Sequence, residues 1–284
     1  MTRKMNIPFT KMHGLGNDFI VINNLHNEHQ FSTKQIAALG HRQFGVGFDQ
    51  LLLIEAASEP GIDFSYRIFN IDGQEVEHCG NGARCFAKYL SDKGLCDGKS
   101  LIVKTVNRVL TLKINDDGSV TVDMEAPEFG ASKIPFIASS SSKIHTRQLT
   151  VSGSSVNVEF CALSMGNPHA VIRVEDIGKT AVKELGKALN VHSDFPEGCN
   201  VGFMQVCDRN TIDLRVYERG AGETLACGTG ACAAVVAGCL QGLLNDTVKV
   251  NLHGGELSIT WLGMDSPVLM TGPATTVFEG KIQI

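Results

Sequence analysis

The chain has 284 residues, of which 43% are hydrophobic and 19% charged, a composition typical of a folded protein and not of a disordered one. Its 25 basic and 30 acidic residues leave a net charge of −5 without a basic block, which argues against nucleic-acid binding. The longest apolar run, Ala231–Leu240, is ten residues long. A membrane-spanning helix needs about 20, so no membrane partner is expected.

Nine cysteines are present, and the N-terminal segment carries charge but lacks the apolar stretch of a secretory signal. This combination favours the reducing cytoplasm. The odd count and the absence of any CxxC pair make a disulfide framework or a four-cysteine zinc site a poor interpretation. We therefore expect a cytoplasmic protein with free thiols and no metal.

In chain order, Ser32 is expected to cap a helix carrying Ile36 and Leu39. Further helices are predicted at 83–90, 180–189 and 231–240. Runs of β-branched residues between turn residues predict strands at 101–106, 109–114, 120–124, 149–151, 156–160, 248–252, 257–262 and 276–284. The segment Pro127–Lys143, with two prolines and a run of serines, is typical of a linker between two halves.

The two halves resemble each other in sequence. Cys79-Gly80-Asn81-Gly82-Ala83 recurs 148 residues later as Cys227-Gly228-Thr229-Gly230-Ala231. Gly16-Asn17 recurs as Gly166-Asn167, 150 residues on, and Val46-Gly47-Phe48-x-Gln50 recurs as Val201-Gly202-Phe203-x-Gln205, 155 residues on. Three matches in one order predict an α+β protein of two pseudo-symmetric mixed α/β domains. The halves expected are residues 1–124 with 273–284, where the last strand crosses back, and residues 125–272.

Each Cys-Gly-x-Gly-Ala element precedes a predicted helix. A helix N-terminus has N–H groups without intrahelical acceptors, and glycines there let a ligand approach the backbone closely. The positive end of the helix dipole favours a carboxylate, an enolate or a cysteine thiolate. Two such cysteines facing each other across a cleft predict a two-base racemase or epimerase, in which one sulfur removes a Cα proton and the other supplies a proton to the opposite face. Such a site needs no cofactor if the helix ends stabilise the developing charge.

A free cysteine is more often a small buried hydrophobe, and we expect this of Cys85, Cys96, Cys161, Cys199, Cys207, Cys232 and Cys239. Only Cys79 and Cys227 recur inside one glycine frame, which favours a catalytic role for both.

Four segments resemble the diaminopimelate epimerase family of lysine biosynthesis, and the resemblance covers nearly the whole chain. These are KMHGLGNDFIVI from Lys11, FNIDGQEVEHCGNGARC from Phe69, MGNPHAV from Met165 and YERGAGETLACGTGACA from Tyr217. The resemblance implies that fold, with a buried central helix in each half and the active site between the halves. It also implies cofactor-independent conversion of LL-diaminopimelate to the meso form, which supplies lysine and cell-wall precursors.

The resemblance further implies roles for individual residues. Cys79 and Cys227 match the catalytic cysteines, and His169 and Glu218 match residues that tune them. Substrate contacts are implied for Asn17, Gln50, Asn70, Gly80, Asn81, Asn167, Asn200, Glu218, Arg219, Gly228 and Thr229. A homodimer is also implied, with Phe278 standing where many relatives have a tyrosine at the dimer contact.

The implied contacts make physical sense, because Arg219 can bind the distant carboxylate bidentately and Glu218 can accept from the distant ammonium. Two alternatives stay open. One is a proline-type racemase of the same fold, which the diacid-binding pair Glu218-Arg219 disfavours. The other is a redox or metal-binding protein that uses its cysteines as a switch or as ligands.

Overall fold

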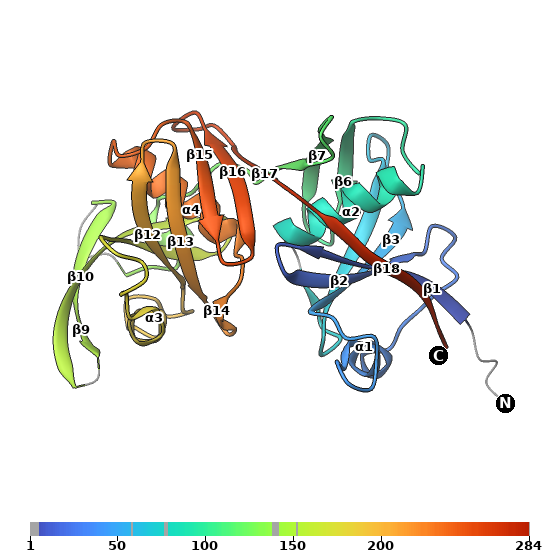
Figure 1. The fold of residues 1–284 in the computed structure, drawn as a ribbon, viewed down its shortest axis with the longest axis horizontal. Helices are drawn as coiled ribbons and strands as arrows, with labels where there is room; N and C mark the ends of the chain where they lie inside the picture. The colour runs from blue at the N-terminus through green and yellow to red at the C-terminus, as the bar shows by residue number, and fades with distance from the viewer. Residues whose placement is uncertain (1–5, 58, 77–78, 138–141, 152, 284) are drawn as a thin grey trace. The chain divides into compact units, whose positions relative to one another are not determined.

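The computed structural model describes residues 6–57, 59–76, 79–137, 142–151 and 153–283. The chain divides into two compact units, Met1–Asp123 with Thr271–Ile284 and Met124–Met270, which are described separately. Both are rich in strands with few helices (Figure 1). The expected α+β class, with mixed α and β structure in two parts, is confirmed. Within the described residues, no helix is long and apolar enough to cross a membrane.

The first unit builds one sheet around a helix. Its strands are β1 (Asn6–Gly14), β2 (Asn17–Asn23), β3 (Gln50–Ala56), β4 (Phe64–Asn70), β5 (Glu75–Val76), β6 (Ser100–Lys104), β7 (Val109–Ile114), β8 (Val120–Asp123) and β18 (Thr275–Gln283). Neighbours pair antiparallel from β18 through β1 to β2, and the pairs β2–β3 and β4–β6 are parallel. The C-terminal strand β18 therefore lies beside β1. Ile284 is outside the described residues.

Helix α2 (Gly80–Asp92) contacts strands on several sides of this sheet, including β1, β2, β7 and β8. All residues from Gly80 to Ala87 are buried, including the large side chains of Arg84 and Phe86. The shorter α1 (Thr33–Gly40) has Ser32 as its N-cap residue, and the Ser32 side chain accepts from the Gln35 N–H in a capping box. The sequence prediction of a cap at Ser32 is confirmed.

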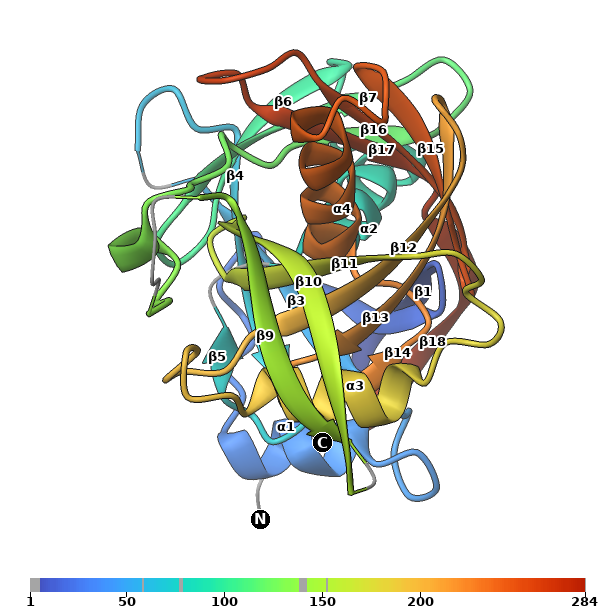
Figure 2. The ribbon, with the colours of Figure 1, turned by 90° about the vertical axis from the view of Figure 1, so that its left-hand side faces the viewer.

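The second unit repeats the arrangement. Its strands are β9 (Ile144–Val151), β10 (Ser154–Ser164), β11 (Pro168–Val174), β12 (Asn200–Asp208), β13 (Thr211–Glu218), β14 (Gly222–Thr224), β15 (Thr247–Leu252), β16 (Gly255–Trp261) and β17 (Val268–Gly272), the last of which leads back to the first unit. The pairs β11–β12 and β13–β15 are parallel, at the positions of β2–β3 and β4–β6. Hairpin β9–β10 is long (Figure 2), and β9 pairs with β10 as β18 pairs with β1.

Helix α4 (Gly228–Leu240) contacts β10, β11, β12 and β16 and is buried over most of its length. Its sequence has no charged residue, so no face of the helix has a charged side chain that would have to be hydrated. Helix α3 (Val182–Asn190) packs on β9, β12 and β13 at the edge of the unit. Each unit thus has one central helix, as predicted, and in both units that helix begins directly after a cysteine.

Two predictions are wrong. The segment 127–143 is not a linker: Glu128 forms a bridge with Ser164, a short 3-10 turn spans Ala131–Lys133, and Ile134 and Phe136 are buried in the core of the second unit. Residues 138–141 of that segment lie outside the described part. The prolines and serines of the segment favoured a linker in the sequence analysis, although Ile134 and Phe136 anchor the segment in the core.

The sequence match between Gln50 and Gln205 also has the wrong register. Gln50 begins β3 and pairs with Phe19, whereas the residue that begins β12 and pairs with His169 is Asn200. Asn200 is therefore the structural counterpart of Gln50, 150 residues on. Gln205 lies deep within β12 and accepts from the Ile177 N–H.

Candidate active site

In the first unit, Cys79 is the N-cap residue of α2. Its backbone is extended, with φ −148° and ψ 108°, and its Sγ accepts from the Gly82 N–H at 3.4 Å. Because a cysteine replaces the usual serine or aspartate of a cap, the sulfur sits where helix N–H groups and the positive dipole end converge. The side chain is half-buried, which leaves the sulfur reachable.

Asn17 follows Gly16 in the first glycine-asparagine turn, begins β2 and contacts this cysteine. Its Oδ1 accepts from Cys79 Sγ at 3.6 Å and from Asn81 Nδ2 at 3.3 Å. Its Nδ2 donates to Asp49 Oδ2 at 3.0 Å. The strand register places Asn17 here, because β1 turns into β2 through Leu15 and Gly16, both with positive φ.

Gln50 and Asn70 face each other across the antiparallel pair β3–β4. Gln50 Nε2 donates to Asn70 Oδ1 at 2.9 Å, and the buried Oε1 of Gln50 has no partner among the described residues. Since Gln50 begins its strand beside β2, the three amides of Asn17, Gln50 and Asn70 belong to one end of the sheet. An unpaired buried acceptor at that end suits a ligand that carries N–H donors.

In the second unit, Cys227 caps α4 in the same way. Its Sγ accepts from the Gly230 N–H at 3.4 Å and lies 3.6 Å from Thr229 Oγ1. Cys227 is only 5% exposed. Burial, and then the neighbouring charge of Glu218, raise the pKa of this thiol well above its ordinary value. The free chain therefore holds Cys227 as a thiol at neutral pH.

Asn167 and His169 follow the second glycine-asparagine turn. Asn167 Nδ2 donates to Thr229 Oγ1 at 3.4 Å, and Asn167 Oδ1 lies 2.9 Å from His169 Nε2. His169 is 1% exposed, and burial lowers its pKa to about 3, so the imidazole is neutral. With the Nε2 proton given to Asn167, Nδ1 is a buried acceptor without a partner among the described residues.

Glu218 is the last residue of β13, and Arg219 directly follows it. Glu218 accepts from Thr224 Oγ1, and burial raises the pKa of its carboxyl. The Arg219 backbone N–H donates to Asn200 Oδ1 at 2.9 Å, while its exposed guanidinium donates to the Glu197 carbonyl at 3.0 Å. Asn200, the first residue of β12, is thereby hydrogen-bonded to Arg219, the first residue after β13. The guanidinium of Arg219 is exposed and can bind an anion.

Each unit thus gathers its own share of the predicted residues. The first collects Asn17, Gln50, Asn70, Cys79, Gly80 and Asn81, and the second Asn167, His169, Asn200, Glu218, Arg219, Cys227, Gly228 and Thr229. Phe278 on β18 is 47% exposed, and its ring meets Phe9 edge-on at 5.9 Å.

Two residues of the first unit escaped the sequence reasoning. Arg84 on α2 is fully buried and donates to Asn81 Oδ1 at 2.9 Å and to the Pro273 carbonyl at 3.1 Å. Asp49 holds Asn17 and is itself paired with Arg42. A signal existed in the repeat: the residue 148 positions after Arg84 is Cys232, and the residue 150 positions after Asp49 is Cys199. At both of these repeat positions the first half has a charged side chain and the second half has a cysteine, so the two halves differ there.

The remaining cysteines are not all buried. Cys85, Cys161, Cys199 and Cys232 are buried as expected, Cys96 and Cys239 are half-buried, and Cys207 is exposed near the end of β12. The prediction for Cys207 is therefore wrong, because the last residues of β12 extend beyond the core.

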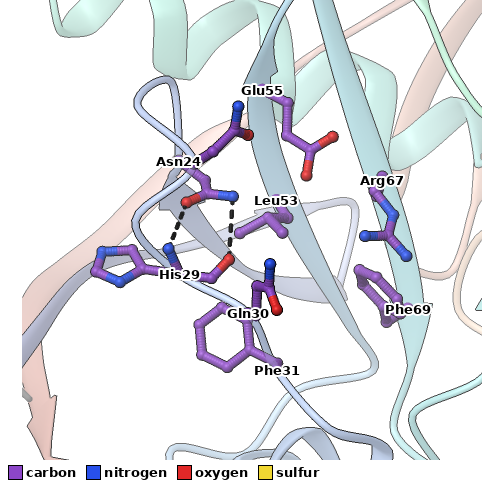
Figure 3. Close-up of a pocket in the computed structure, with 9 residues that line it drawn as sticks. Asn24, His29, Gln30, Phe31, Leu53, Glu55, Arg67 and Phe69 are labelled. Carbon is purple, nitrogen blue, oxygen red and sulfur yellow. Dashed lines mark hydrogen bonds between the residues drawn. The ribbon is translucent and has the colours of Figure 1, made fainter.

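A surface cavity of about 290 Å³ lies elsewhere in the first unit (Figure 3). His29, Glu55, Arg67 and Phe69 contribute to its lining, and Asn24 ties the adjoining loop through hydrogen bonds with the His29 backbone. None of the predicted site residues lines this cavity.

The fold is that of a class of two-part proteins known from solved structures. A phenazine biosynthesis protein of the PhzF family from Bacillus anthracis matches 99% of this chain and 100% of its own, with a TM-score of 0.69 at 15% identity. A hydroxyproline epimerase from Agrobacterium vitis matches 98% of this chain and 93% of its own, also with a TM-score of 0.69 and 15% identity.

The sequence narrows this class to one family. The family model described as diaminopimelate epimerase matches residues 9–130 and 161–277. A diaminopimelate epimerase of Cupriavidus metallidurans is 53% identical over 99% of this chain and 98% of its own length, and one of Ralstonia pickettii is 52% identical over 99% and 97%. The chain belongs to the diaminopimelate epimerase family.

Proposed function

We propose that the chain interconverts LL- and meso-diaminopimelate by a two-base mechanism in which Cys79 and Cys227 are the two proton carriers. The epimerase activity, a step of lysine biosynthesis, follows from family membership. The roles of the residues are the proposal. The observation that carries it is the N-cap position of both cysteines, each with its sulfur on a backbone N–H of a glycine-led helix.

The proposed step conserves protons. One cysteine, as thiolate, takes the Cα proton and becomes a thiol, while the other thiol gives its proton to the opposite face of the same carbon and becomes a thiolate. The negative charge that develops at the substrate carboxylate meets the backbone N–H groups of Gly80-Asn81 and Gly228-Thr229, which lie in the first helical turns. No cofactor takes part in this proposal.

The inert end of the substrate needs separate recognition, and the second unit offers it. Arg219 supplies a guanidinium for the distant carboxylate and Glu218 an acceptor for the distant ammonium. The amides of Asn167 and Asn200 are neutral partners in the second unit, and that of Asn70 is one from the first. Asn17 and Gln50 are the further proposed substrate contacts of the first unit. The raised pKa of Glu218 and the neutral imidazole of His169 support roles in tuning the cysteines.

We further propose that the two units act as the two halves of one epimerase, that the chain works in the cytoplasm, and that it forms a homodimer. The exposed ring of Phe278 supports a contact on β18. Phenylalanine provides the ring of such a contact without a hydroxyl, so the dimer would rest on apolar packing there.

The test starts from LL-diaminopimelate in heavy water. The product should carry deuterium at the inverted carbon, while substrate recovered early should hold little, because the incoming and outgoing protons travel on different sulfurs. Cys79→Ala and Cys227→Ala should each abolish epimerisation, and Cys85→Ala should keep it. Label in both pools from the first turnovers would instead indicate one shared base. Near-full activity of either N-cap variant would exclude the mechanism.

A further inference from the structure

The side chain of Asn17 is turned in one particular direction. A carboxamide has a donor end and an acceptor end, so its orientation decides what its neighbours meet. Asn17 Nδ2 donates to Asp49 Oδ2 at 3.0 Å, and Oδ1 consequently faces Cys79 Sγ at 3.6 Å. The carboxylate of Asp49 can only accept, so this end of the contact has no alternative direction.

Asn81 is turned from the other end by Arg84. A guanidinium can only donate, and Arg84 donates to Asn81 Oδ1 at 2.9 Å. Asn81 Nδ2 is left to face Asn17 Oδ1 at 3.3 Å. A donor-only group and an acceptor-only group therefore stand at the two ends, and both amides between them have a single consistent direction. Asn17 lies on β2, Asn81 and Arg84 lie on α2, and Asp49 directly precedes β3; in Figure 1 these elements belong together in the first unit, and α2 contacts both strands.

The second unit has the opposite polarity. Asn167 turns its nitrogen toward Thr229 and its oxygen toward His169 Nε2. The residues that correspond to Asp49 and Arg84 are Cys199 and Cys232, which are buried thiols and not a carboxylate and a guanidinium. An oxygen facing the N-cap sulfur by way of the glycine-asparagine turn is therefore a property of the first half alone.

We propose that Asp49 and Arg84 are positioning residues that hold the amides of Asn17 and Asn81 in one direction, so that the Cys79 sulfur faces an acceptor oxygen. The proposal rests on the proposed function only in taking Cys79 as a proton carrier. An acceptor oxygen favours the protonated thiol, whereas a reversed amide would offer N–H groups that favour the thiolate. The two residues thereby set how readily Cys79 gives and takes its proton.

Tyr66 and Cys85 interact electrostatically with Cys79, and neither changes charge near neutral pH. Tyr66 on β4 is fully buried, which raises the pKa of its hydroxyl far above its usual range. Burial likewise raises the pKa of Cys85 on α2 to about 12. Arg84 is permanently charged. A change in Cys79 reactivity after substitution of Asp49 is therefore not a titration of Tyr66 or Cys85, and the charge of Asp49 and the direction of the amide are the two causes to separate.

The pair Asp49→Asn and Asp49→Ala separates those two causes. Both remove the charge, but asparagine keeps an oxygen for Asn17 Nδ2 and alanine does not. The readouts are kcat for diaminopimelate and the pH midpoint of Cys79 alkylation by iodoacetamide, followed on the Cys79 peptide by mass spectrometry. Relative to Asp49→Asn, we expect Asp49→Ala to lower kcat about tenfold and the midpoint by about one pH unit, the size of one lost hydrogen bond. Equal midpoints and equal kcat for the two variants would overturn the proposal.

Arg84→Lys tests the other end while keeping the charge. In the Asp49→Ala background it should lower the alkylation midpoint further than the sum of the two single changes, because the amides can reverse freely only when both ends are released. Additive shifts would remove Arg84 from the proposal. Arg84 is buried, so these proteins are first compared with the parent by circular dichroism. If Arg84→Lys does not fold, the half-buried Asp49 pair decides alone.

The alkylation readout needs no epimerase activity. If Cys79→Ala kept full activity, the proposed function would fail while the Asp49 pair still reported the direction of the amide. If Cys79→Ala were inactive and the Asp49 pair showed no difference, only the positioning role would fail.

Discussion

The carboxylate of Glu218 lies close enough to the thiol of Cys227 for its charge to favour the protonated form of the second N-cap sulfur. Burial is the larger cause of the raised pKa of Cys227, and Glu218 adds to it. The first N-cap sulfur instead faces the neutral amide oxygen of Asn17. Two cysteines in matching backbone positions thus meet acceptors of different charge.

Glu218→Gln should lower the pKa of Cys227, because it removes the negative charge next to the sulfur and leaves the burial unchanged. The expected result is a lower pH midpoint for iodoacetamide labelling of the Cys227 peptide, in the urea-free native protein. Glu223→Gln is the matched control, since Glu223 is an acidic residue of β14 that pairs with Arg215. An unchanged midpoint in Glu218→Gln, or an equal shift in the control, would contradict the assignment.

His169 should make the chain less stable in acid. Its folded-state pKa of about 3 lies below the unfolded value of 6.5, so between these values the unfolded chain binds a proton that the folded chain does not. Stability is therefore lost as the pH falls below about 6.5, by roughly 1.4 kcal/mol per pH unit at most. His169→Gln should flatten the pH dependence of the unfolding free energy between pH 6.5 and 5, measured by urea titration.

The control for that measurement is His253→Gln, which removes an exposed imidazole. It should leave the slope between pH 6.5 and 5 as in the parent chain. A His169→Gln slope equal to the parent's would show that the imidazole is not buried in its neutral form.

Arg219→Ala should weaken the binding of diaminopimelate and leave the fold nearly unchanged. The guanidinium is exposed, and the hydrogen bond from the Arg219 backbone N–H to Asn200 is retained. Losing a charge-assisted contact to the distant carboxylate should lower kcat/KM by roughly 30-fold, the size of a 2 kcal/mol loss. Steady-state kinetics measures this, with Arg173→Ala on β11 as the exposed control. A specificity constant within twofold of the parent's would remove Arg219 from the substrate site.

Gly186→Ala should destabilise the second unit although it lies in a helix. Helix propensity alone predicts a gain of about 1 kcal/mol from alanine. A Cβ at Gly186, however, would lie 2.5 Å from Tyr217 Cβ, so α3 would have to move away from β13. We expect a net loss of roughly 1–3 kcal/mol in the unfolding free energy, as for other overpacked sites. Lys183→Ala, exposed on the same helix, should be nearly neutral, and a stabilised Gly186→Ala protein would contradict the close packing.

Local patterns in the sequence were sufficient for much of this protein. The glycine frame around Cys79 and Cys227 predicted both central helices, and Ser32 predicted a cap, because capping and close backbone approach depend on neighbouring residues. The alternating apolar runs predicted strands such as Val109–Ile114 with their observed bounds. The internal repeat predicted an α+β protein in two similar parts.

Only the tertiary structure decided which residues meet across strands. Gln50 corresponds to Asn200 and not to Gln205 because parallel pairing fixes the register, which a sequence match cannot measure. Ile134 and Phe136 anchor a segment that its prolines disguise as a linker, because burial depends on distant partners. The importance of Arg84 and Asp49 is visible only from their hydrogen bonds with Asn81 and Asn17. The Asn17–Asp49 contact joins residues far apart in the chain, and such contacts set the direction of an amide.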